Sequence, residues 1–268
     1  MASSPRPRRV AVVGGGPAGM EAARVAAERG HRVTLFERER ALGGQLRLAA
    51  APPFKKDLAL LLAHLKKQVK EKTDVRIQTG VDAGTLREEG YDFVIVATGA
   101  FPSPQPSGEG LAAAQTWEVL GGKIKLPGAR VAVLGYRRVA CELSEYLAVR
   151  RKKEVTLIHF GSLDEVANDV EPLIERRLLI ARLRETGVKI LVETKVTGLT
   201  SEGVRVEGKN SGLIPSDHIV KDDPPRPCGS LFRELQGNMR VIAVGDCAEP
   251  GDLYQAIHQG FRAGYSIE

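Results

Sequence analysis

Short apolar runs alternate along the chain with longer stretches in which apolar residues recur at helical spacing. Helices are predicted over residues 57–70 and 173–187 from this spacing. The polar stretch 82–89 is interpreted as a connection, and the proline- and glycine-rich stretch 102–110 as a loop. Strands are predicted from apolar runs at 10–13, 33–37, 75–78, 93–97, 130–134, 155–158, 189–192, 204–207 and from 240 onward. This alternation predicts an α/β fold of mainly parallel sheet with helices on both faces.

The first apolar run leads into a glycine-rich turn of the type that binds dinucleotides. Gly14, Gly16 and Gly19 form a G-x-G-x-x-G array directly before a helical stretch. The first glycine permits a tight turn, the second lets backbone approach a pyrophosphate, and the third lets helix and strand pack closely. The helix N-terminus offers free N–H groups to that pyrophosphate. The candidate residues of this loop are Gly14, Gly16, Pro17, Ala18 and Gly19.

An acidic residue ends the second apolar run at the distance that a dinucleotide site requires. Glu37 follows the glycines by about 20 residues, where a carboxylate accepts hydrogen bonds from an adenosine ribose, and Arg38 adjoins it. Strand, glycine array, helix, strand and acid in this order predict a bound adenine dinucleotide. A glycine-rich turn kept for packing alone is the alternative that the pattern leaves open.

The same pattern recurs in altered form. Residues 130–135, RVAVLG, align with residues 9–14, RVAVVG, and the alignment places Arg137 on the second glycine and Ala140 on the third. His159 then falls on the position of the ribose carboxylate. An arginine at the second glycine puts a long side chain where a pyrophosphate approaches the backbone. Two nucleotide-binding folds are therefore predicted in one chain, with the second site impaired.

The last strand of the repeat and the two residues after it differ between the two folds as well. Residues 92–99 end in Thr98 and Gly99, whereas the aligned residues 217–224 end in Asp223 and Pro224. The buried strand and its Thr-Gly exit are therefore predicted to be lost from the second fold, because proline cannot donate a hydrogen bond to a sheet.

These changes bear on nicotinamide nucleotides. We expect NADH to bind weakly and to reduce a bound flavin slowly. The alternative is that Arg137, Arg138 and His159 gather around a 2′-phosphate and favour NADPH.

Composition is that of an ordinary globular enzyme. A hydrophobic content of 43% over 268 residues is enough for a large core. No transmembrane run is visible, and residues 1–9 are polar and basic with no apolar signal segment behind them, so a cytoplasmic protein is expected. The three cysteines, Cys141, Cys228 and Cys247, include no C-x-x-C pair and are too few for a four-cysteine iron–sulfur site within the chain.

The net charge of +6 raises the question of nucleic acid. The basic clusters at 6–9, 150–153 and 176–177 are separated in sequence, and aromatic residues make up only 5% of the chain, which leaves few stacking platforms. Nucleic acid is therefore not expected as a partner. A basic surface can instead steer an acidic protein partner.

Several sequence blocks together carry a resemblance to a known family. The chain resembles the C-terminal FAD/NAD(P)-binding module of the NADH:flavin oxidoreductases, the group that contains 2,4-dienoyl-CoA reductase and trimethylamine dehydrogenase. The blocks that carry it are VAVVGGGPAGMEAA, LFERERALGGQL, VIVATGA, TWEVL and VIAVGDCAEPGDLYQAIHQGFRAG. In that family an FMN-bearing barrel with an iron–sulfur cluster precedes the module, and the sequence contains nothing that resembles the barrel.

The resemblance implies roles for matching residues. The first glycine array would hold the FAD pyrophosphate and Glu37 the ribose. Asp246 would bind the ribityl chain, although its place before a helix also suits an N-cap. Trimethylamine dehydrogenase holds ADP at its first site, so ADP is the alternative to FAD. The remaining residues that would border the cofactor are Gly43, Gly44, Gln45, Ala97, Thr98, Gly99, Gly245 and Ala256.

These observations predict two Rossmann-like lobes with the second inserted in the first, as in flavoprotein disulfide reductases. Residues 1–126 and 228–268 form the predicted FAD lobe, and 127–227 a degenerate NAD(P)-binding-like lobe. We expect an FAD-dependent oxidoreductase module that relays electrons to or from a partner carrying FMN or an iron–sulfur cluster, with no catalytic side chain of its own. The alternatives are an NAD(P)H-dependent flavin oxidoreductase and a non-catalytic module that binds ADP or FAD for structure.

Overall fold

The computed structural model describes residues 2–52, 54–103 and 113–268, and the chain divides into two compact units. Unit 1 comprises Met1–Phe101 and Pro225–Glu268, and unit 2 comprises Pro102–Pro224. The sequence-based division placed residues 102–126 with the first lobe. In the structure the described residues from 113 onward pack with unit 2, since β6 pairs with β13. Most of the loop predicted at 102–110 lies outside the described residues.

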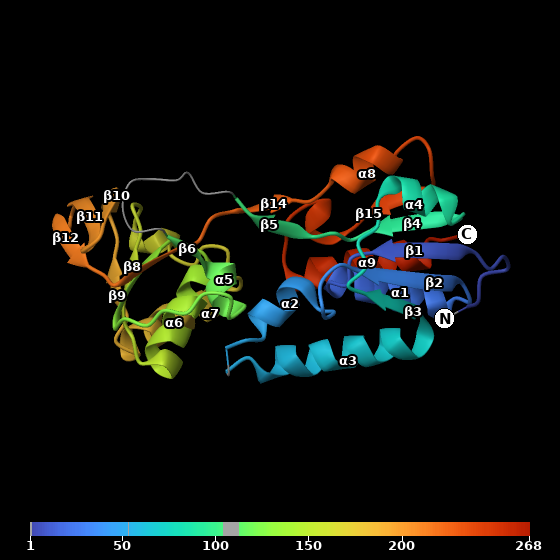
Figure 1. Cartoon of the computed structure of the whole chain (residues 1–268). Helices are drawn as coiled ribbons and strands as arrows, with labels where there is room; N and C mark the ends of the chain where they lie inside the picture. The colour runs from blue at the N-terminus through green and yellow to red at the C-terminus, as the bar shows by residue number, and fades with distance from the viewer. Residues whose placement is uncertain (1, 53, 104–112) are drawn as a thin grey trace. The chain divides into compact units, whose positions relative to one another are not determined.

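Unit 1 is built on a five-stranded parallel sheet in the order β15-β4-β1-β2-β3 (Figure 1). Each strand is a short apolar run, and the central β1 and β4 are buried on both faces, as is usual for parallel sheets. The strands are β1 (Arg9–Val13), β2 (Arg32–Glu37), β3 (Asp74–Ile77), β4 (Phe93–Val96) and β15 (Val241–Ala243).

Helices cover both faces of this sheet. On one face α1, α3 and α9 pack around Val12 and Leu35, and on the other α4 and α8 pack around Phe36 and Val94 (Figure 1). The helical segments are α1 (Pro17–Glu28), α2 (Gly44–Ala49), α3 (Lys56–Lys72), α4 (Ala83–Glu88), α8 (Ser230–Leu235), η2 (Gly245–Cys247) and α9 (Leu253–Tyr265).

The expectation of a polar connection at 82–89 was wrong, because α4 forms there. Asp82 caps this helix by accepting a hydrogen bond from the Thr85 N–H at 2.8 Å. Ala83 and Leu86 bury one side of it against the sheet. Two apolar residues one turn apart are too weak a periodic signal to predict so short a helix.

Unit 2 repeats the sheet and adds an antiparallel appendage. Its five-stranded parallel sheet has the order β6-β13-β7-β8-β9, and β10, β11 and β12 form a three-stranded antiparallel sheet. The strands are β6 (Ala114–Gln115), β7 (Arg130–Leu134), β8 (Glu154–Ile158), β9 (Lys189–Leu191), β10 (Thr194–Thr200), β11 (Gly203–Gly208), β12 (Gly212–Pro215) and β13 (His218–Lys221). The helices are α5 (Thr116–Leu120), α6 (Arg138–Arg151), η1 (Leu163–Glu165) and α7 (Leu173–Glu185).

The last strand of the repeat survives in unit 2, which corrects the expectation that it is lost. β13 pairs in parallel with β7, as β4 pairs with β1 in unit 1. Ile219 and Val220 are fully buried and supply enough apolar surface to hold this strand in the sheet. The sequence change is confined to the residues that follow it. Farther along, β14 (Pro225–Pro227) pairs with β5 (Ala100–Pro102) where the chain passes between the units.

Candidate functional site

The first glycine loop is shaped by two glycines that no other residue could replace. Gly14 has φ +111°, and a Cβ built on it would lie 2.2 Å from the Ala97 carbonyl oxygen. A Cβ on Gly19 would lie 1.9 Å from the Gly14 oxygen, so the helix and strand meet backbone to backbone. Gly16 differs from both, because a Cβ there would meet nothing within 4 Å. Gly14 and Gly19 therefore build the turn, and Gly16 keeps a space beside it open.

That space lies at the N-terminal end of α1. The helix begins with Pro17, and its N-cap residue, Gly16, has no side chain to cap it. Among the described residues, no side chain accepts a hydrogen bond from the N–H groups of Ala18 or Gly19, and the first turn contains no acid. Free N–H groups and the positive end of the helix dipole therefore remain for an anionic ligand, which is the arrangement that a pyrophosphate requires.

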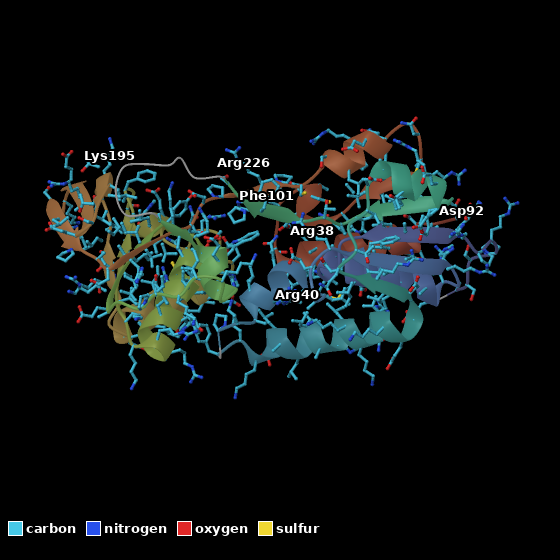
Figure 2. The ribbon with its side chains drawn as sticks, in the orientation of Figure 1. Arg38, Arg40, Asp92, Phe101, Lys195 and Arg226 are labelled. Carbon is cyan, nitrogen blue, oxygen red and sulfur yellow. The ribbon has the colours of Figure 1, made fainter. Side chains whose placement is uncertain are left out.

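The Glu37 carboxylate is fixed beside this loop. One oxygen accepts a hydrogen bond from the Gly15 N–H at 2.9 Å and the other from the Glu39 N–H at 2.8 Å, with the residue 7% exposed. Each carboxylate oxygen keeps a further lone pair for a ribose hydroxyl. Arg38, which is labelled in Figure 2, takes no part in this arrangement, because its side chain is exposed and its Nε lies 3.8 Å from Glu39 Oε1.

A second segment crosses the glycine loop. The Gly43 N–H donates to the Gly15 oxygen at 2.7 Å, and a Cβ on Gly44 would lie 3.1 Å from the Gly16 Cα. Gln45 follows in the first turn of α2 and donates from Nε2 to Asp246 Oδ2 at 2.6 Å. The predicted residues Gly44, Gln45 and Asp246 are thus brought to the loop, although they are distant in sequence.

Asp246 is not the N-cap of α9, which was the alternative role for this residue. Asp252 caps that helix by accepting from the Gln255 N–H at 2.7 Å. Asp246 lies six residues earlier, in η2, where its Oδ1 accepts from the Gly251 N–H at 3.1 Å. The Gly245 N–H donates to Gln259 Oε1 at 2.6 Å, so α9 also fixes this turn. Farther along α9, Ala256 is buried.

Thr98 and Gly99 fasten the chain where it leaves and re-enters unit 1. The Thr98 hydroxyl donates to the Cys228 oxygen at 2.5 Å, and the Cys228 N–H donates to the Gly99 oxygen at 2.9 Å. The Ala97 N–H donates to the Val13 oxygen at 2.8 Å, and the Ala97 backbone lies against Gly14 of the glycine loop. The Thr98 hydroxyl is used in this crossing, and Gly99 suits it because its φ of +70° favours glycine.

The second glycine loop is arranged differently. The sequence places Arg137 over the loop as an obstruction, but the structure directs its side chain toward the end of β13. The guanidinium donates to Asp222 Oδ1 at 2.9 Å and to the Asp223 oxygen at 2.7 Å. Asp222 occupies the position of Ala97 in the repeat, so the introduced cation and its counter-charge lie side by side.

The Asp222 carboxyl group is buried, and within the described part of the chain only one of its two oxygens is hydrogen-bonded. The residue is 8% exposed, and its Oδ2 atom has no hydrogen-bond partner among the described residues. Burial raises the pKa of this carboxyl to about 6, against the opposing effect of the Arg137 charge. Thr116 Oγ1 approaches the other oxygen at 3.3 Å.

An acid covers the N-terminus of α6. The Arg138 N–H in its first turn donates to Asp169 Oδ1 at 2.8 Å. Asp169 belongs to the segment that crosses this loop, since the Ala167 N–H donates to the Tyr136 oxygen as the Gly43 N–H donates to Gly15. Sequence reasoning missed Asp169, because no motif marks the crossing segment of unit 2 and the internal alignment shifts register after His159.

In unit 2, side chains also occupy the position that corresponds to the ribose-binding carboxylate of unit 1. His159 is 3% exposed, and its ring lies 4.6 Å from the Tyr136 ring, centroid to centroid. Burial lowers the pKa of this imidazole, which favours the neutral form. Tyr136 falls on Gly15 in the repeat, so an aromatic ring stands where unit 1 has no side chain. Within unit 2, Arg137 is bound to Asp222 and His159 packs on Tyr136, so the two side chains are directed to different neighbours.

Among the residues that the structure describes, no helix has the length and apolarity needed to span a bilayer.

Comparison with known proteins gives one family match and a set of longer relatives. Residues 8–221 match the family model described as pyridine nucleotide-disulphide oxidoreductase. The chain is 35% identical over 263 residues to bilirubin reductase of Mediterraneibacter gnavus, covering 96% of this chain and 40% of that protein. It is 33% identical over 275 residues to NADH oxidase of Thermoanaerobacter brockii, covering 98% and 42%. The chain thus spans about 40% of the length of these relatives.

Solved structures confirm the predicted α/β fold class. A 2-naphthoyl-CoA reductase complex superimposes over 100% of this chain and 41% of its own, with a TM-score of 0.90 and 27% identity. Histamine dehydrogenase from Rhizobium has the same fold, with a TM-score of 0.87, 22% identity, and coverage of 100% and 42%.

Proposed function

The chain belongs to the pyridine nucleotide-disulphide oxidoreductase family, and we propose that it is a module that holds FAD at the first glycine loop and exchanges electrons with a redox centre on a partner. Membership confirms the resemblance to the C-terminal FAD/NAD module and the prediction of an FAD-binding oxidoreductase. Because the larger part of each relative lies outside the match, the partner and the overall reaction belong to the proposal.

The contrast between the two glycine loops is the observation that carries this proposal. At the first loop Gly16 faces open space and the N-terminus of α1 has no acid or cap. At the second loop Asp169 caps α6, and Arg137 is bound to Asp222. One chain therefore offers one site that is ready for a pyrophosphate and one that its own side chains fill.

The residues at the first loop fit the parts of FAD. The N–H groups of Ala18 and Gly19 would hold the pyrophosphate, and the Glu37 carboxylate the adenosine ribose. Asp246, held by Gln45 at 2.6 Å, would accept hydrogen bonds from the ribityl hydroxyls. The isoalloxazine ring supplies the redox chemistry when bound, and the protein contributes binding, orientation and exclusion of water.

The proposal assigns the exchange of electrons to a partner that carries FMN or an iron–sulfur cluster. The chain holds three cysteines, and the two that are fully buried, Cys141 and Cys247, lie in different units. A second redox centre would therefore come from outside the described residues, either as a separate polypeptide or as a further domain.

A second candidate is an NAD(P)H-dependent flavin oxidoreductase, favoured by the 33% identity to an NADH oxidase over 98% of this chain. A third, a structural module that binds ADP, rests on the same open loop, because ADP shares the pyrophosphate and ribose that the loop would hold.

The visible spectrum of the purified protein separates the three. We expect flavin absorbance that bleaches slowly with NADH under anaerobic conditions and rapidly with dithionite. Rapid bleaching by NADH favours the second candidate. Bound ADP without flavin, identified after acid release, favours the third.

For the partner, we expect a protein with flavin or iron–sulfur absorbance to co-purify from the source organism. A chain that is solitary there and reduces acceptors alone would contradict the proposal.

A further inference from the structure

The exposed face of α9 carries four aromatic rings in a single line. Tyr254, His258, Phe261 and Tyr265 recur at intervals of four, three and four residues, which places them within a sector of about 60° on a helix of 3.6 residues per turn. Tyr254 is 69% exposed, Phe261 36% and Tyr265 49%. We call these four residues the aromatic stripe.

The rings of the stripe contact one another in pairs. The rings of Tyr254 and His258 lie 4.1 Å apart between centroids, and those of Phe261 and Tyr265 are stacked at 5.9 Å with an angle of 8° between their planes. The opposite side of α9 is pressed against α1, because a Cβ on Gly260 would lie 2.3 Å from the Ala18 oxygen. The helix therefore cannot turn to bury the rings within the chain, and they form a preorganised apolar surface.

The composition of this surface is that of the centre of a protein interface. Tyrosine, phenylalanine and arginine are enriched there and supply most of the binding energy. Arg29 lies over the Tyr265 ring, with its Cζ 4.8 Å from the centroid, and Arg262 flanks the stripe with no ion-pair partner among the described residues. An apolar line with a basic edge fits a partner surface that is apolar at its centre and acidic at its rim.

The stripe connects the candidate flavin site with the start of the chain. Tyr254 lies on the first turn of α9, and this end adjoins Asp246, whose Oδ1 accepts from Gly251. At the other end, the Ser4 N–H donates to the Arg29 oxygen at 2.7 Å, and Arg8 Nε donates to the Glu268 oxygen at 3.0 Å. Figure 1 shows the two termini on the same side of unit 1.

The position of the N-terminal segment indicates what covers the stripe. The chain corresponds to the C-terminal module of longer relatives, so their additional chain joins the module at the segment equivalent to residues 1–8. That segment lies against Arg29 and the end of α9. Additional chain that enters there starts beside the C-terminal end of the stripe.

We propose that the aromatic stripe of α9 is the docking surface for the domain or protein that carries the second redox centre. This inference rests on the proposed function. Docking there would seat the partner along the helix whose N-terminal end adjoins the flavin, which keeps the path between the two centres short. The occupant is one redox protein domain with an acidic rim, and neither a second copy of this chain nor a membrane surface.

Photo-crosslinking in the source organism tests the inference. A benzophenone amino acid replaces Tyr254, Phe261 or Tyr265 in the full chain, and Leu60 and Leu178, which are 69% and 53% exposed on α3 and α7, serve as matched controls. We expect crosslinks at the three stripe positions, at least tenfold above those at the controls, to a single protein or domain that contains flavin or an iron–sulfur cluster.

A second variant measures the contribution of the rings. Phe261→Ser combined with Tyr254→Ser is expected to reduce recovery of that protein at least tenfold, while flavin content and dithionite bleaching stay at the wild-type level. The same redox protein crosslinking at Leu60 or Leu178 instead of the stripe, or crosslinks that join two copies of this chain, would overturn the docking surface and leave the proposed function intact. If wild-type chain recovers no redox protein, the proposed function fails and the inference fails with it.

Discussion

In unit 1 the segment that crosses the glycine loop is Gly43-Gly44, whereas in unit 2 the equivalent segment runs from Ala167 to Asp169. Both are fastened by the same backbone hydrogen bond to the loop. The glycines leave the N-terminus of α1 bare, and Asp169 puts a carboxylate on the N-terminus of α6. The carboxylate accepts from the Arg138 N–H, which has no counterpart in unit 1 because Pro17 stands there, and it brings to the positive end of the helix dipole the negative charge that a phosphate would bring. The comparison teaches that a nucleotide fold can close its site by supplying its own anion.

Two further positions differ together. Gly16 of unit 1 corresponds to Arg137 of unit 2, and Ala97 corresponds to Asp222. The side chains of Arg137 and Asp222 bind each other at 2.9 Å. Either change alone would leave a charge without a partner in a poorly solvated place. Made together, they convert an open site into an internal ion pair and leave the sheet of unit 2 intact, since β13 still pairs with β7.

The largest effect is expected from filling the open loop. Gly16→Leu should weaken FAD binding by about 3 kcal/mol or more, roughly hundredfold, because the side chain occupies the space where at least two charge-assisted hydrogen bonds to the pyrophosphate would form. The fold should survive, since no atom lies within 4 Å of the new Cβ. Flavin absorbance per chain and the melting temperature of the apoprotein are the measurements. Gly80→Leu, at another open glycine, is the matched control, and full flavin retention by Gly16→Leu would remove the site from this loop.

Titration of the buried ion pair gives the next largest effect. The pKa of Asp222 is about 6, above its ordinary value of 3.8, so the folded state holds the proton more tightly than the unfolded state. Its contribution to the free energy of unfolding is therefore fully present below about pH 4 and is lost as the pH rises through 6, a change of about 3 kcal/mol. The free energy of unfolding of wild type relative to Asp222→Asn should fall over this window. Parallel curves for the two proteins would show that Asp222 titrates normally.

Removing the charge of Glu37 should weaken FAD binding about tenfold. Glu37→Gln keeps an acceptor for the Gly15 N–H but loses the charge-assisted bonds to the ribose, about 1.5 kcal/mol of FAD affinity. The matched change at the second site, His159→Gln, should leave FAD affinity unchanged. Equal losses in the two variants, measured by fluorescence titration of apoprotein with FAD, would contradict the assignment of the ribose site to unit 1.

Opening the second loop should have the smallest effect. Asp169→Ala removes the carboxylate from the N-terminus of α6 and should lower the free energy of unfolding by about 1 kcal/mol. NADH affinity should rise only a few-fold, because the Tyr136 and His159 rings still occupy the position of the ribose. An unchanged melting curve would show that Asp169 does not stabilise the helix end.

Local patterns were enough to predict most of the fold. The apolar runs and the glycine array identified the central strands of both sheets and the helix after each loop. The helix α4 and strand β13 were missed for the same physical reason, because each depends on two buried residues whose partners come from elsewhere in the chain. The placement of residues 114–120 in unit 2 likewise depends on the pairing of β6 with β13, which no local pattern encodes.

The candidate site was predictable where it is continuous in sequence. Gly14, Gly16, Gly19 and Glu37 follow one motif, and the structure places them around one loop. Gln45 and Asp246 were indicated only by the resemblance to a family, and the bond that joins them, 201 positions apart, was not predicted. Asp169 and Tyr136 were missed because they close a site, and closing residues follow no motif.

Stopped-flow mixing of the FAD-loaded chain with NADH under anaerobic conditions tests the central claim most directly, since it asks whether the second loop still delivers a nicotinamide to the flavin bound at the first. The account predicts one flavin per chain and a bleaching rate that stays low and rises linearly with NADH up to millimolar concentration, for NADPH as well. Fast bleaching that saturates at micromolar NADH would contradict it, because a second loop closed by Asp169 and by the Tyr136 and His159 rings could not bind the nucleotide so tightly.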